Sequence, residues 1–251
     1  VSVVIAVVIL AYAAKYRNLL AGVLAIVQLV GSVVFDVVYA HGIAVPQGLY
    51  IDSLSLLMTF IIGIIGTGIC IYAIGYMRDF QAHAKEGEKD RRPTFFALMF
   101  AFLGAMYIII FSDNLSWLFI GWEVTTLCSF LLIGYTKTEE AINNAFRQII
   151  MNLVGGIGFV VALYVSVLKM GTLSLSAFIA GAVANPDIAL LAVVGLSLAG
   201  ITKAAQMPFQ TWLLGAMVAP TPTSALLHSS TMVKAGVFLL VKLAPVYLVC
   251  A

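Results

Sequence analysis

Five titratable side chains lie inside long apolar segments of the sequence, where charged residues are rare: Glu123, Lys203, His228, Lys234 and Lys242. A carboxylate, an amine and an imidazole all bind and release protons, and a neutral imidazole can donate from one nitrogen while it accepts on the other. An ionisable group at the centre of a bilayer costs at least about 2.5–3.5 kcal/mol, so it usually faces protein or water and often marks an ion path. These residue types therefore predict proton transfer through an apolar layer.

The depth of these side chains along their segments predicts that three of them lie at a similar level. With a rise of about 1.5 Å per residue, Glu123 lies roughly 12 Å into its segment and Lys234 roughly 18 Å into its own. Lys203 lies at the midpoint of residues 188–217. A buried lysine can instead extend its amine to the membrane interface, and Lys242 near the end of its segment fits that simpler explanation.

The overall composition excludes a water-soluble globular domain. Hydrophobic residues make up 63% of the 251 residues and charged residues 10%, whereas soluble domains carry about 25% charged residues. A helix that crosses a bilayer takes about 20 apolar residues. Eight uninterrupted apolar stretches are candidates: 1–14, 19–39, 53–77, 95–111, 115–135, 148–168, 188–217 and 223–250. The sequence therefore predicts an all-α protein, a polytopic membrane helix bundle of about eight transmembrane helices in one domain, residues 1–251.

The seventh stretch is too long for one straight helix and contains Pro208. Proline removes a backbone donor and clashes with the preceding turn, so we expect the helix to break near Met207–Phe209. A break at this depth would leave carbonyl groups unpaired, and irregular backbone inside a membrane is tolerated only where protein encloses it or water reaches it. Broken helices are typical of transport sites.

Basic residues between the stretches predict the orientation, because short loops retain them on the cytoplasmic side. The loops after the first, third and fifth stretches hold nine, whereas those after the second, fourth and sixth hold only Lys169. The nine are Lys15, Arg17, Arg78, Lys85, Lys89, Arg91, Arg92, Lys137 and Arg147. This asymmetry predicts an N-terminus on the outside. Trp117 and Trp122, near the outer start of the fifth stretch, are expected to be interfacial anchors or packing residues.

The other motifs disfavour an active site. Cys70, Cys128 and Cys250 show no CxxC or Cys/His spacing, so we expect neither disulfides nor a metal site. We find no Ser/His/Asp set in the sequence, and the glycines of residues 155–158 are explained as close helix contacts. We expect no cofactor and no catalytic site on this chain. The net charge of +2 gives little support to nucleic-acid binding.

Three segments resemble one known family. They are residues 121–135 (GWEVTTLCSFLLIGY), residues 201–245 (beginning ITKAAQMPFQTW and containing APTPTSALLHSSTMVK) and residues 50–58 (YIDSLSLLM). They are similar to the antiporter-like, proton-translocating subunits shared by respiratory complex I, the multisubunit Na+/H+ antiporters and the energy-converting membrane-bound hydrogenases. The resemblance covers nearly the whole chain.

The resemblance implies roles for the buried charges. Glu123 would pair with Lys203 on the broken helix, His228 and Lys234 would relay protons on the next helix, and Lys242 matches a basic position near that helix's far end. Burial disfavours the charged form of an acid or an amine, whereas a nearby opposite charge favours it. Separation of the pair would therefore release a proton, and renewed pairing would reload it.

The resemblance also implies an organisation. Residues 1–94 would form three N-terminal helices and an inside loop, and residues 95–250 a five-helix half-channel repeat whose inverted second copy this chain lacks. The partners would be other membrane subunits of a multisubunit complex with a redox arm on the inside, the lipid bilayer, and H+ or Na+. The expected location is a prokaryotic cytoplasmic membrane, with a mitochondrial inner membrane as the second choice.

Three alternatives remain open at this point. The same half-channel could serve Na+/H+ exchange, although one acid at the membrane centre provides few ligands for Na+. The chain could be a scaffold subunit whose buried charges only lock helices together. A membrane-embedded enzyme is a third possibility, disfavoured by the missing catalytic motifs.

Overall fold

The computed structural model describes residues 1–39, 43, 45, 48–83 and 90–250. Two of the basic residues counted for the orientation, Lys85 and Lys89, lie outside the described residues. Within the described ranges the regular structure is helical, and strand-like pairing is limited to isolated bridges at Leu49–Ser112 and Asn114–Ser174. The predicted all-α fold class is confirmed.

Seven helical segments of the described chain are long and apolar enough to cross a membrane. Four are single helices: α2 (Leu19–Val38), α5 (Arg92–Phe111), α7 (Glu139–Met170) and α9 (Pro186–Lys203). Three join several pieces: α3 (Ser53–Phe60), η1 (Ile61–Gly66) and α4 (Thr67–Ala82); α6 (Leu115–Ile133) and η2 (Gly134–Thr136); α11 (Thr221–Ala225), η4 (Leu226–Ser230) and α12 (Met232–Lys242). The shorter helices are α1 (Ser2–Lys15), α8 (Leu175–Ala184), α10 (Thr211–Gly215), η3 (Ala216–Val218) and α13 (Ala244–Cys250).

Capping residues explain where several elements differ from the expected stretches. The sixth stretch begins at Glu139 because the Thr138 side chain accepts a hydrogen bond from the Ala141 amide and starts the helix. The expected loop over residues 169–187 contains α8, which Ser174 caps in the same way. The first stretch forms α1, whose 14 residues fall short of the length of a full span.

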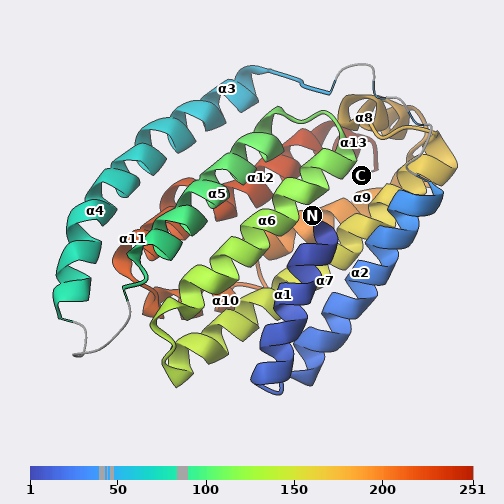
Figure 1. Ribbon diagram of the computed structural model, residues 1–251. Coiled ribbons are helices and arrows are strands. Elements are labelled where there is room, and N and C mark those ends of the chain that lie inside the picture. The colour runs from blue at the N-terminus through green and yellow to red at the C-terminus, as the bar shows by residue number, and fades with distance from the viewer. Residues whose placement is uncertain (40–42, 44, 46–47, 84–89, 251) are drawn as a thin grey trace.

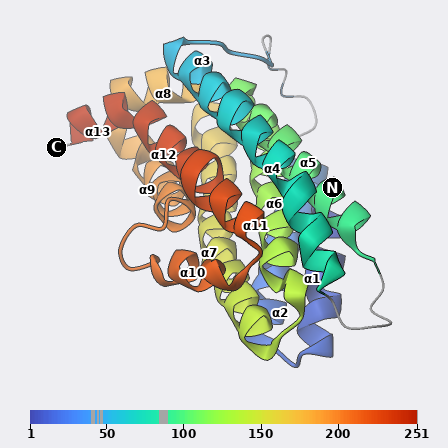
Figure 2. The same cartoon turned by 90° about the vertical axis from the view of Figure 1, so that its left-hand side faces the viewer.

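Helix α7 lies at the centre of the bundle and packs against α2, α6, α9 and α10. The pair α3 and α4 runs along one edge beside α5, and α1 with α2 lies on the opposite side (Figure 1). Viewed from the side, α12 crosses next to α9 (Figure 2). The interior of the bundle is therefore formed by α5, α6, α7, α9 and α12.

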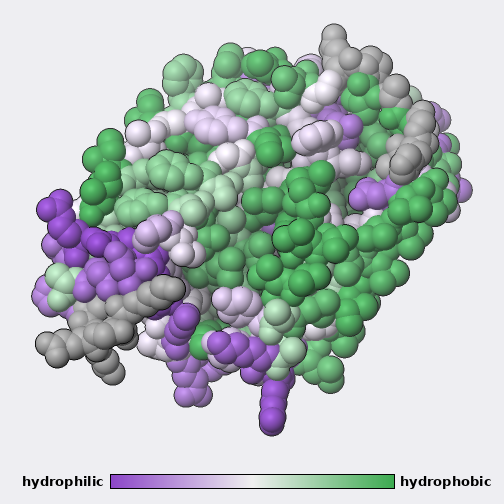
Figure 3. Space-filling model, in the orientation of Figure 1, coloured by the Kyte–Doolittle hydropathy of each residue, from purple (hydrophilic) through white to green (hydrophobic). Residues whose placement is uncertain are grey.

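Apolar side chains cover much of the outside, as a lipid-facing surface requires. Figure 3 shows this apolar surface and a hydrophilic region at the end of the bundle where α4 and α6 finish. The exposed basic residues Arg78 and Lys137 lie at those two helix ends. The structure thus collects these charges at one end, and the orientation of that end in a membrane stays a prediction.

Glycines let α7 and α9 approach closely, which confirms the explanation of residues 155–158 as helix contacts. A Cβ atom on Gly155 would overlap the Thr202 hydroxyl, and one on Gly158 would lie 2.8 Å from the backbone oxygen of Gly195. Thr202 directly precedes Lys203. The close approach of the two backbones therefore positions the end of α9 inside the bundle.

We expect Gly195→Ala to lower the thermal midpoint, because the added Cβ would overlap the backbone oxygen of Gly158, which cannot move aside. Overpacking of this kind costs about 1–3 kcal/mol. The matched control is Gly68→Ala, whose Cβ meets no atom within 4 Å and which gains helix propensity. Thermal unfolding of the purified protein measures both variants. Equal midpoints would show that the two backbones are not in contact.

Candidate functional site

The break that follows α9 begins earlier than the sequence suggested. We expected it near Met207–Phe209, but α9 ends at Lys203 and the chain is not helical again until Thr211. The physical reason is that the Pro208 ring clashes with the carbonyl four residues before it, at Ala204, so the last helical turn must stop there. Lys203 is consequently the final residue of the helix.

The end of α9 pairs the carbonyl groups of Gly200, Ile201 and Thr202, although the break was expected to leave carbonyl groups unpaired. Ala205 has a φ of 52°, and the Gln206 amide donates to the Ile201 carbonyl at 3.0 Å, which together form a Schellman-type helix end. The Thr202 carbonyl accepts the Ala205 amide at 3.2 Å and the indole of Trp212 in α10 at 2.8 Å. The break is therefore enclosed by protein at these carbonyls.

The Lys203 amine is fully buried and docks on helix α6. Its Nζ atom donates to the Trp122 carbonyl and to the Thr125 hydroxyl, both at 2.6 Å, and lies 4.3 Å from the centre of the Trp122 ring. Trp122 is fully buried, so its interpretation as an interfacial anchor is wrong, whereas Trp117 is exposed. A buried amine held by two neutral oxygens and an aromatic face has no direct counter-charge at this position.

Glu123 is also buried but does not form the expected direct pair with Lys203. Within the described residues the ion pairs are Arg92–Asp90 and Lys242–Asp52. Successive residues of a helix point about 100° apart, so Glu123 faces away from the Trp122 face that holds the amine. Its side chain lines a small cavity together with Gln28 of α2, and its Oε1 atom has no hydrogen-bond partner. The acid and the amine still interact electrostatically.

His228 lies in η4, a π-helical turn that the sequence reasoning missed. Its ring lies near the backbone of Leu213 in α10, and its Nε2 atom has no hydrogen-bond partner. Helicity is interrupted at Thr231, with φ −132° and ψ −82°. Thr231 was the available signal, since its hydroxyl donates to the Leu226 carbonyl and such hydroxyl groups compete for backbone groups and bend helices.

Lys234 is half-buried in α12 and makes no hydrogen bond or ion pair with described groups. Helix α12 packs closely on α9, because a Cβ on Gly200 would lie 2.8 Å from the Leu240 side chain and 3.2 Å from the Gly236 carbonyl. The structure therefore brings the helices of Lys203 and Lys234 together without direct contact between the two amines.

Lys242 is held by an acid and does not simply extend to the interface. Its Nζ atom lies 2.6 Å from a carboxylate oxygen of Asp52, and the Tyr50 and Phe238 rings flank it at 4.9 and 5.3 Å. Asp52 also accepts the Ser55 amide at 2.8 Å and so caps α3. Burial opposes ionisation of Asp52, but the hydrogen bonds from Lys242 and Ser55 outweigh it and hold its pKa below the usual value.

A cavity of about 550 Å³ opens beside this ion pair. Ser112, Asp113 and Ser176 contribute polar groups to its wall, and the carboxylate of Asp113 accepts hydrogen bonds from Ser176. The sequence reasoning did not single out Asp52, although an acid directly before a serine at a helix start is a capping signal. The ion pair joins this end of α3 to the end of α12.

The ion pair at Asp52 gives a pH-dependent prediction. Because the folded-state pKa is lowered, its contribution to stability is present above the pKa of the unfolded chain and is lost as the pH falls through the folded value. Asp52→Asn should lower the thermal midpoint at pH 7 by the equivalent of about 1 kcal/mol or less, since the pair is partly exposed, and the difference should shrink in acid. In a double-mutant cycle, Lys242→Gln should add little to Asp52→Asn. Additive losses would mean that the two side chains do not interact.

Neutral polar side chains form a further row that has no charge to reveal it. On α7, Gln148 and Asn152 are fully buried one turn apart, and the Gln148 amide donates to the Ser129 hydroxyl of α6 at 2.8 Å. Gln148 Oε1 and Asn152 Oδ1 have no hydrogen-bond partner. The spacing of Asn144, Gln148 and Asn152 by four residues was the sequence signal. This row leads from the α6–α7 turn towards the level of Lys203.

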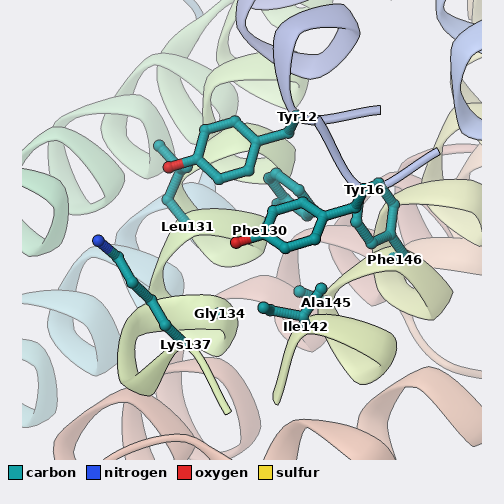
Figure 4. A pocket seen from close by; sticks show the side chains of 9 residues that line it. All are labelled: Tyr12, Tyr16, Phe130, Leu131, Gly134, Lys137, Ile142, Ala145 and Phe146. Atoms are coloured by element: carbon teal, nitrogen blue, oxygen red, sulfur yellow. The ribbon is translucent and has the colours of Figure 1, made fainter. Parts of the chain in front are cut away.

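A small aromatic pocket lies between α1, α6 and α7, apart from the buried charges. Figure 4 shows Tyr12, Tyr16 and Phe130 around it, with the Lys137 side chain at its rim. Its volume of about 30 Å³ has room for about two waters. No group of three or more His, Cys, Asp or Glu side chains among the described residues could hold a metal ion.

These observations define a class, a polytopic membrane protein with a buried acid, a buried amine and a broken helix inside the bundle. The chain belongs to the family described as NADH:quinone oxidoreductase/Mrp antiporter, transmembrane region, whose family model matches residues 112–251. A second model, the N-terminus of chain 5 of NADH-ubiquinone oxidoreductase (complex I), matches residues 37–85.

Individual relatives agree with this assignment. The chain is 39% identical over 216 residues to NADH-quinone oxidoreductase subunit L of Mycobacterium tuberculosis, covering 85% of this chain and 33% of that one. It is 37% identical over 202 residues to Na+/H+ antiporter subunit A1 of Staphylococcus haemolyticus, covering 79% and 24%. The chain thus spans about a quarter to a third of the length of these relatives.

Two solved structures have a similar fold. The Mrp complex from Dietzia sp. contains a chain with a TM-score of 0.69 and 30% identity, covering 98% of this chain and 28% of that one. A chain of an archaeal membrane-bound sulfane sulfur reductase has a TM-score of 0.65 and covers 94% and 50%. At 20% identity, the second likeness supports the fold alone.

Proposed function

We propose that this chain is the N-terminal half-channel of a proton-translocating subunit in a multisubunit membrane complex, with Lys203 as its central proton carrier. The observation that carries the proposal is the setting of the Lys203 amine. It is fully buried, it donates to two neutral oxygens, and it has an acid nearby without direct contact. In this proposal residues 95–250 form the half-channel, and residues 1–94 the N-terminal helices and inside loop.

The proposed chemistry is a change in the distance between Glu123 and Lys203. A carboxylate that approaches the amine stabilises its protonated form, and a carboxylate that withdraws towards Gln28 removes this stabilisation. Two unit charges 4 Å apart interact by about 4 kcal/mol at an effective dielectric constant of about 20. Moving one charge across 100 mV requires about 2.3 kcal/mol. Withdrawal of the carboxylate from about 4 Å to about 10 Å would weaken this interaction by about 2.5 kcal/mol, which is sufficient to drive a proton off Lys203.

The proposed route uses polar groups on both sides of Lys203. Protons would enter from the end of the bundle that carries the basic loops. They would reach Lys203 along the row formed by Asn144, Gln148 and Asn152. His228 and Lys234 would pass them on along α12, and the cavity beside Lys242 lies at the far end of that helix. Water between these groups would complete the route, because the side chains do not contact one another directly.

The parent complex would supply the movement of Glu123. The named relatives include subunits of a quinone oxidoreductase and of an Na+/H+ antiporter, so we propose other membrane subunits as partners. In a complex like the quinone oxidoreductase, the partners would include a redox arm on the inside. A bacterial cytoplasmic membrane with the N-terminus outside is the proposed setting. Na+/H+ exchange is the second candidate function, favoured by the likeness to the antiporter subunit and to the Mrp complex.

Proton movement in vesicles that carry the whole complex tests the proposal. We expect a pH gradient to form in media in which choline replaces Na+, with a rate that added Na+ does not change. A strict requirement for Na+ would favour exchange. If variants without the buried charges move protons at the wild-type rate, only a scaffold role remains for this subunit.

A further inference from the structure

Gln28 is a buried amide on the membrane-facing helix α2. It is 5% exposed, and it lies on the inner face of α2 with Ala21, Ala25 and Ser32. An amide in apolar surroundings costs free energy unless it is hydrogen-bonded. An apolar residue would fill this position at no such cost, so the amide needs an explanation that packing does not give.

The chain leaves a slot for this amide on α7, which lies beside α2 (Figure 1). A Cβ on Gly156 would lie 2.6 Å from Oε1 of Gln28 and 2.9 Å from both its Cδ and its Nε2. The neighbouring Gly155 and Gly158 serve a different purpose, because their missing side chains admit α9. Gly156 therefore admits the side chain of Gln28.

The amide meets the acid of the proposed pair. Glu123 and Gln28 line the same small cavity, and Oε1 of Glu123 and Oε1 of Gln28 both lack a hydrogen-bond partner. Since two acceptor oxygens repel, the Nε2 group of Gln28 is the one that can donate to the carboxylate. This cavity of about 10 Å³ also adjoins Ser32, with room for about one water.

We propose that Gln28 is a positioning residue for Glu123, which it holds on the α2 side of α6 and away from the Lys203 amine, in a slot set by Gly156. This inference rests on the proposed function, since it assigns Gln28 to the separated state of the acid and the amine. Loss of the amide leaves the separated carboxylate without its donor. The carboxylate then remains nearer to Lys203, and the amine releases its proton more slowly.

Two variants test this role in the whole complex. Gln28→Met keeps the length of the side chain and removes the donor, while Gly156→Ala keeps the donor and fills the slot. We expect about tenfold slower proton transport per assembled complex in both, a factor that corresponds to about 1.4 kcal/mol. Gly104→Ala is the matched control, because its Cβ meets no atom within 4 Å.

An infrared measurement separates positioning from a merely structural role. The antisymmetric stretching band of the Glu123 carboxylate is assigned by its loss in Glu123→Gln. Loss of a hydrogen bond raises the frequency of this band, so Gln28→Met and Gly156→Ala should both shift it upwards. An unshifted band with wild-type transport per complex would overturn the inference. If Gly156→Ala fails to assemble, Gln28→Met decides alone, because an apolar chain of the same length suits this helix.

The two proposals fail in different ways. Wild-type transport in Glu123→Gln would overturn the proposed function, whereas the band shift in Gln28→Met would still report the contact. If Glu123→Gln loses transport while Gln28→Met shows transport at the wild-type rate and an unshifted band, only the role of Gln28 is overturned.

Discussion

Lys203→Met is expected to abolish proton transport by the complex while the protein becomes more stable. Methionine keeps the apolar stem that packs at the end of α9 but has no proton to bind, and a positioned acid or base contributes about 10²–10⁴-fold to proton transfer. A buried amine without a direct counter-charge lowers stability, so its removal should raise the thermal midpoint. Dye-monitored acidification of vesicles and thermal unfolding measure the two effects.

The control for this variant is Lys169→Met, which changes an exposed lysine at the end of α7. It should leave transport and the thermal midpoint near the wild-type values. Transport at the wild-type rate in Lys203→Met would reject Lys203 as the carrier. Loss of transport together with a lower midpoint would instead indicate that the amine supports the fold.

Glu123→Gln is expected to reduce proton transport by about tenfold or more. The amide has nearly the same shape but cannot carry the charge that stabilises a protonated Lys203, and a close charge contributes about 4 kcal/mol at 4 Å. The same vesicle assay measures the loss. Glu140→Gln, an exposed acid in the first turn of α7, is the matched control. Equal rates in Glu123→Gln and the control would show that the acid takes no part in transport.

The sequence predicts the bundle and its buried charges well, because both depend on residue type and on the length of apolar runs. Helix ends are harder to predict. Pro208 marks a break, but its clash acts four residues earlier, and the left-handed conformation of Ala205 then closes the helix directly after Lys203. Alanine gives no sequence signal for that conformation, since glycine is the usual residue there.

Contacts between helices are the part that the sequence does not determine. Whether Lys203 meets Glu123 or the face with Thr125 depends on the rotation of α6 about its axis, because these two residues point about 160° apart. Asp52 and Lys242 are 190 positions apart, so their ion pair depends on how α3 packs against the bundle. Neutral residues such as Gln28 carry no charge that would single them out in an apolar stretch.

The central claim is that the carboxylate of Glu123 changes its partner as protons move. Time-resolved infrared spectroscopy of the energised complex tests it most directly, with the Glu123 carboxylate band assigned through Glu123→Gln. We predict that this band changes in step with proton release and stays constant in Lys203→Met. A Glu123 band that stays unchanged while the wild-type complex transports protons would contradict the account.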